Sequence, residues 1–109
     1  MSHSDSQRAA STVSSRDRKS AVEPVDPEEV LAGVAALTVS TWEYDARPGV
    51  THMGPMAEEF HDVFGLGADE RRIGSIDVDG VALAAIQGLA GRIEAANERI
   101  DALETTVER

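Results

Sequence analysis

The chain has 109 residues, no cysteine and twice as many acidic as basic side chains, which gives a formal net charge of −10. A domain of this length has little hydrophobic core of its own and no disulfide to compensate, so self-association is the remaining route to stability. The strong negative charge disfavours nucleic acid and anionic membranes as partners.

The first thirteen positions, residues 1–13, are predicted to be a disordered tail. Seven serines fall within the first twenty residues, and no apolar run accompanies them, so this part of the chain cannot bury enough surface to order itself. It also lacks the apolar centre of a signal peptide, and no stretch of the sequence is long enough to span a bilayer. We therefore expect a cytoplasmic protein.

The next segment opens a short amphipathic helix. Asp26 can cap the helix, Pro27 fits its first position, and Glu29 can close a capping box. Apolar residues then recur at helical spacing, at Val30, Leu31, Val34 and Leu37.

A β-hairpin is predicted to follow. Residues 38–44 contain β-formers at Val39, Thr41, Trp42 and Tyr44, Pro48-Gly49 is a turn signal, and residues 50–53 can return as the second strand. Gly54-Pro55 then ends the hairpin.

Two further helices are predicted after the hairpin. The first has an apolar face and ends at Gly65-Leu66-Gly67. A polar loop, residues 68–72, leads to a short strand around residues 73–78. Asp79 is interpreted as the cap of the final helix, which begins with Gly80. The apolar face of the first of these helices consists of Met56, Phe60, Val63 and Phe64.

The final helix carries an unbroken heptad pattern, in which apolar residues alternate three and four apart. On this register Arg99 is a g position and Glu104 the following e position, so an interchain pair would favour parallel strands. The alternative is an amphipathic helix folded onto its own domain. The a and d positions are Ile86, Leu89, Ile93, Ala96, Ile100, Leu103 and Val107.

Four segments together resemble one known module: Glu23–Leu31, Thr38–Tyr44, His52–Phe60 and Asp77–Leu89. They are similar to the C-terminal intramolecular chaperone domain of phage endosialidases, tailspikes and tail fibres, from about Ser14 onwards. The resemblance implies an α+β fold, with a mixed core at residues 14–79 and a coiled-coil helix at 80–109.

The resemblance also implies an assembly and a partner. It indicates a homotrimer, although β-branched a positions with leucine at d lean towards dimers in model coiled coils. The partner would be a fibre or spike passenger, fused in cis or encoded by an adjacent coding region. The resemblance therefore adds a second expected location: besides the cytoplasm, the chain can be a precursor associated with the virion or its tail.

In this family a serine lies five residues before a lysine, just ahead of the segment matched by Glu23–Leu31. The matching residues here are Ser14 and Lys19, the only lysine of the chain. The resemblance implies a self-cleaving serine endopeptidase in which Ser14 is the nucleophile, Lys19 is the base, and the bond cut is Val13–Ser14. One departure is plain: the family usually has aspartate after the serine, where this chain has Ser15.

The chemistry of such a pair sets two conditions. A serine hydroxyl needs a base, and a lysine amine, with a pKa of about 10.4 in water, serves only when desolvation or nearby positive charge makes it neutral. Arg16 and Arg18 are suitable nearby cations. A spacing of five places two side chains about 140° apart around a regular helix, so a loop or neighbouring subunits must bring them together.

Two alternatives remain at this point. Ser14 and Lys19 can be two solvated residues of an inert tail, which would leave a non-cleaving trimerisation module of a fibre protein. The chain can also be a coiled-coil adaptor that oligomerises only with a host partner.

Several other residues are assigned structural roles. His52, Gly54 and Pro55 match a family segment of the core, where they support the fold, and His52 has the further option of orienting the scissile region. Trp42, Asp79 and Gly80 are also interpreted as structural residues.

No metal or cofactor is expected. Glu58, His61 and Asp62 share one helical face that is typical of a solvated surface. Residues 77–80 resemble part of a calcium loop, but Ile86 stands at its bidentate glutamate position.

Overall fold

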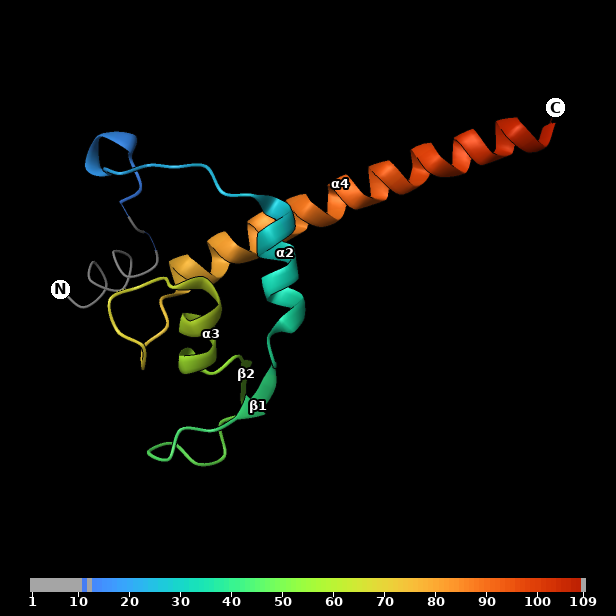
Figure 1. The fold of residues 1–109 in the computed structure, drawn as a ribbon. Coiled ribbons are helices and arrows are strands. Elements are labelled where there is room, and N and C mark those ends of the chain that lie inside the picture. The colour runs from blue at the N-terminus through green and yellow to red at the C-terminus, as the bar shows by residue number, and fades with distance from the viewer. Residues whose placement is uncertain (1–10, 12, 109) are drawn as a thin grey trace.

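A computed structural model describes residue 11 and residues 13–108 (Figure 1). The predicted tail at residues 1–13 therefore lies outside the described residues, apart from Ser11 and Val13. The fold combines a small hairpin with short helices and one long helix, which confirms the predicted α+β class. In chain order the elements are η1 (Arg16–Arg18), α2 (Pro27–Ala36), β1 (Ser40–Trp42), β2 (His52–Gly54), α3 (Ala57–Phe64) and α4 (Ser75–Glu108).

Helix α2 begins at the predicted residues, but the capping box predicted through Glu29 does not form, because the Asp26 cap bonds the Glu28 amide and no bond returns from the Glu29 side chain among the described contacts. The Asp26 carboxylate accepts a hydrogen bond from the Glu28 amide at 3.0 Å, and Pro27 occupies the first turn, where a missing amide proton costs nothing. Leu31 is the residue of this helix that is buried.

The hairpin and α3 also confirm their predicted order. Strands β1 and β2 are antiparallel, with Trp42 opposite His52, and both are shorter than the sequence suggested. Helix α3 ends at Gly65, which adopts a left-handed φ of 63° and donates its amide to the His61 carbonyl at 2.7 Å. Glycine tolerates this conformation without steric cost, so the helix stops there.

Helix α4 corrects two predictions. It begins at Ser75, so the strand predicted at residues 73–78 is wrong, and Asp79 lies inside the helix instead of capping it. The amides of Asp77 and Val78 both donate to the Gly74 carbonyl at 3.1 Å, which closes the first helical turn earlier than expected. The helix continues through Gly80 without interruption.

The core lies where α4 crosses α2, with α3 beside them (Figure 1). The crossing is close at Gly88: a methyl group added there would lie 2.7 Å from the Pro27 carbonyl oxygen. An ion pair at 2.9 Å joins Arg92 of α4 to Glu28 of α2. The buried apolar residues are Leu31, Phe60, Val81, Ala84 and Ala85.

The C-terminal part of α4 extends away from this core (Figure 1). The radius of gyration is 19.5 Å, whereas a compact chain of this length would have about 13 Å. Within the described part of the chain, no helix is both long and apolar enough to cross a membrane.

Candidate functional site

The side chains of Ser14 and Lys19 meet across a single tight turn. The ammonium nitrogen Nζ of Lys19 donates to the Ser14 hydroxyl oxygen Oγ at 2.7 Å. Between them, η1 is a 3₁₀ turn closed by two backbone bonds, from the Arg18 amide to Ser15 and from the Lys19 amide to Arg16. A 3₁₀ turn with extended residues on both sides brings together side chains that a regular α-helix would hold apart.

This pair lies open to solvent in the single chain. Ser14, Arg16, Lys19 and Val22 line a shallow cavity of about 180 Å³. All four residues are exposed. Arg16 supplies a second cation beside the amine. Val13 is also exposed, so the peptide bond that joins it to Ser14 is accessible.

The residue that departs from the family pattern makes a contact of its own. Ser15 donates its hydroxyl to the Asp17 carboxylate, and its backbone carbonyl accepts the Arg18 amide. A carboxylate is therefore present in this loop, on Asp17 instead of on the residue after the nucleophile. The sequence pattern alone did not single out Asp17.

His52 belongs to an aromatic cluster on the hairpin. Its ring stacks on Trp42 with centroids 5.1 Å apart and meets the edge of Tyr44 at 5.4 Å. The Trp42 indole Nε1 donates to the Gly54 carbonyl at 3.3 Å, immediately before Pro55. In Figure 1 the hairpin lies in the lower part of the view, while η1, in blue, lies in the upper part.

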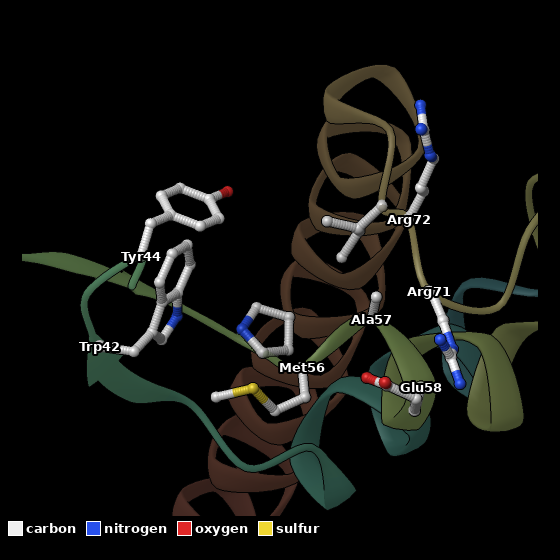
Figure 2. Close-up of a pocket in the computed structure, with 9 residues that line it drawn as sticks. Trp42, Tyr44, Met56, Ala57, Glu58, Arg71 and Arg72 are labelled. Atoms are coloured by element: carbon white, nitrogen blue, oxygen red, sulfur yellow. The ribbon is translucent and has the colours of Figure 1, made fainter. Parts of the chain in front are cut away.

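An open groove of about 500 Å³ lies between this hairpin and the loop that precedes α4. Figure 2 shows Trp42 and Tyr44 on one side and Arg71 and Arg72 on the other, with Met56 at the base. Sequence reasoning treated the two arginines as part of a polar loop. Two adjacent arginines in a chain with few basic residues are the signal that could have marked them.

The heptad residues of α4 form an exposed apolar stripe. All seven are exposed, and Ile93 and Leu103 retain 61% and 64% of their accessible surface. The residues of α4 that are buried lie on another face, at Val81, Ala84, Ala85 and Gly88. The alternative that the stripe folds onto its own domain is therefore wrong: the face of α4 that packs on the domain consists of these buried residues, and the stripe stays exposed.

The acidic face around α3 shows no arrangement that holds a metal ion. His61 directs its Nδ1 at the Leu66 carbonyl, 3.3 Å away, at the C-terminal end of the helix. Across residue 11 and residues 13–108, no three potential ligands of the His, Cys, Asp or Glu type gather at one point.

Comparison with known protein families gives a match that includes Ser14 and Lys19. Residues 14–66 match the family model described as chaperone of endosialidase. This segment belongs to that family. The match begins at Ser14 and covers η1, α2, the hairpin and α3, while α4 lies beyond it. It confirms the family resemblance drawn from the sequence and is consistent with an intramolecular chaperone. A search of curated proteins gave no match.

Proposed function

We propose that this chain, whose residues 14–66 match the chaperone of endosialidase, trimerises a tail-fibre or tailspike-type passenger and then releases itself by cutting the Val13–Ser14 bond. The hydrogen bond from Lys19 to Ser14, at 2.7 Å, is the observation that carries the proposal. It joins a nucleophile and a base directly, at the residue where the family match begins.

The cleavage reaction uses the two residues in turn. A neutral Lys19 amine takes the proton of the Ser14 hydroxyl, and Oγ attacks the carbonyl carbon of Val13. The C–N bond breaks, and the Lys19 ammonium gives its proton to the departing α-amine of Ser14. Water then hydrolyses the ester between Val13 and Ser14, which leaves a Val13 carboxylate and a free serine hydroxyl.

Assembly uses the apolar stripe of α4. Three parallel copies would bury Ile93, Ile100 and their heptad neighbours in one seam, and Arg99 of each copy would face Glu104 of the next. A β-rich fibre is slow to align, because its contacts are distant in sequence. An early helical trimer raises the effective concentration of the strands and fixes their alignment.

Assembly and cleavage are coupled through solvent. A lysine amine acts as a base only when it is neutral, and the Ser14–Lys19 pair is exposed to solvent in the single chain. The flanking residues Val13 and Val22 are also exposed, at 75% and 61%. A neighbouring copy that covers these valines would remove water from the amine and so switch the base on.

A non-cleaving trimerisation module is the second candidate. The observation in its favour is the same solvent exposure, together with Ser15 at the position where the family usually has aspartate. In that case α2, the hairpin and the stripe still serve assembly, and Ser14 and Lys19 remain solvated residues without a chemical role.

Mass spectrometry of the chain with a passenger ahead of Met1 separates these candidates. Under the cleavage hypothesis the wild type yields a product that begins Ser14-Ser15-Arg16. Ser14→Ala and Lys19→Ala remain full length, and Lys19→Arg does too, because a guanidinium does not accept a proton.

A matched control completes the design. Ser20→Ala changes an exposed serine next to Lys19 and should cut like the wild type. If the wild type stays intact while light scattering shows a full trimer, the non-cleaving module is correct. If the wild type is intact and monomeric, both candidates fail.

A further inference from the structure

We propose that Ser15 and Asp17 are positioning residues that hold the η1 turn and thereby keep Lys19 against Ser14. The Ser15 hydroxyl donates to the Asp17 carboxylate, and the Ser15 carbonyl accepts the Arg18 amide at 3.0 Å. One of these bonds joins two side chains and the other joins two backbone groups, and both stabilise the same turn. This inference rests on the proposed cleavage function.

The turn has little other support in the chain. None of its residues is buried, and among the residues that the structure describes one further backbone bond, from the Lys19 amide to Arg16 at 3.2 Å, closes it. A single exposed turn gains one hydrogen bond while it fixes several backbone angles, so it is unstable alone. A serine that bonds a side chain two residues ahead lowers this cost, because it restricts the same residues.

Loss of the turn would separate Ser14 from Lys19. The side chains of Ser14 and Lys19 meet only because η1 lies between them, and the turn is the structure that Ser15 and Asp17 stabilise. Neither residue bonds to Ser14 or to the Lys19 amine among the contacts of the described chain. Their effect on cleavage is therefore through the position of the amine, and small displacements of a catalytic group reduce rates strongly.

The first test measures the turn without any reaction. In the Ser14→Ala background, which stays full length, amide exchange of Arg18 and Lys19 is followed by NMR. Adding Ser15→Ala or Asp17→Ala should accelerate exchange at both amides by at least severalfold. Adding Ser15→Thr, which keeps the hydroxyl, or Asp17→Asn, which keeps an acceptor oxygen, should leave exchange close to the background. Adding Ser20→Ala is the matched control.

The second test measures cleavage of the passenger fusion. We expect Ser15→Ala and Asp17→Ala each to slow cleavage about tenfold, as the loss of one hydrogen bond to a charged group would. Ser15→Thr and Asp17→Asn should cut within about twofold of the wild type, and the double alanine variant should be no slower than either single one, because both remove the same bond. Asp45→Ala, which removes an exposed carboxylate in the hairpin loop, controls for charge.

The outcomes separate the two proposals. Unchanged amide exchange in Ser15→Ala overturns the positioning role, because the bond would then not hold the turn. An Asp17→Asn variant that cuts as slowly as Asp17→Ala also overturns it, because the negative charge of Asp17 and not its hydrogen bond would then matter. If no fusion is cut, the cleavage function fails, and with it any effect of Ser15 and Asp17 on cleavage. Faster amide exchange in the alanine variants would then still show that these two residues hold the turn.

Discussion

The close crossing of α2 and α4 makes Gly88→Ala the most informative stability test. The added methyl carbon would lie 2.7 Å from the Pro27 carbonyl oxygen and 3.1 Å from the Cβ of Leu31. Pro27 cannot retreat easily, because it lies in the capped first turn of α2, which packs against α4. Overpacking of this kind costs about 1–3 kcal/mol, which the better helix propensity of alanine offsets by about 1 kcal/mol.

Gly91→Ala is the matched control, one turn further along the same helix. A methyl group there meets nothing within 4 Å, so the variant should gain about 1 kcal/mol. The two variants should therefore differ by about 2 kcal/mol, or about 10 °C in Tm. Circular dichroism melts at one chain concentration measure this, since self-association would make the Tm depend on concentration. A Gly88→Ala variant that melts as high as Gly91→Ala would refute the close crossing.

Three further outcomes are expected. Ile93→Asp combined with Ile100→Asp would bury charges in the stripe, so light scattering should show monomers or aggregates, and an unchanged wild-type mass would disprove the seam. The Tm should rise from physiological to molar salt, because screening shortens the repulsion between acidic groups from about 8 to about 3 Å, and a flat or falling trend would contradict this. A double-mutant cycle on Glu28 and Arg92 should give a coupling below about 1 kcal/mol, since these side chains retain 52% and 60% of their surface, and a larger value would contradict that exposure.

Elements whose ends are set by neighbouring residues were predictable from the sequence. Asp26-Pro27 identified the start of α2, and Gly65 identified the end of α3, because both signals act within one helical turn. The strand predicted at residues 73–78 is wrong, because the helix that begins at Ser75 continues into Val81, which is buried in the core. Tertiary packing therefore decides the structure there.

Long-range contacts had no local signal. The Thr38 amide donates to the Glu59 carboxylate at 2.8 Å, and Gly88 approaches Pro27, yet neither pair is marked by spacing or residue type. For the candidate site, the family resemblance identified Ser14 and Lys19. The turn that joins them could not be predicted, because a spacing of five suggests separation on any regular helix.

The unsupported end of α4 has a consequence for when this protein becomes ordered. From Ile93 to Glu108 every residue of the helix is exposed. An isolated helix of this length is marginal in water, so a lone copy should fray there and regain its helix only beside other copies. Helical content should therefore fall on dilution, as in folding coupled to binding. We therefore expect this end of α4 to stay partly unwound in a free chain and to become ordered only if copies assemble along it.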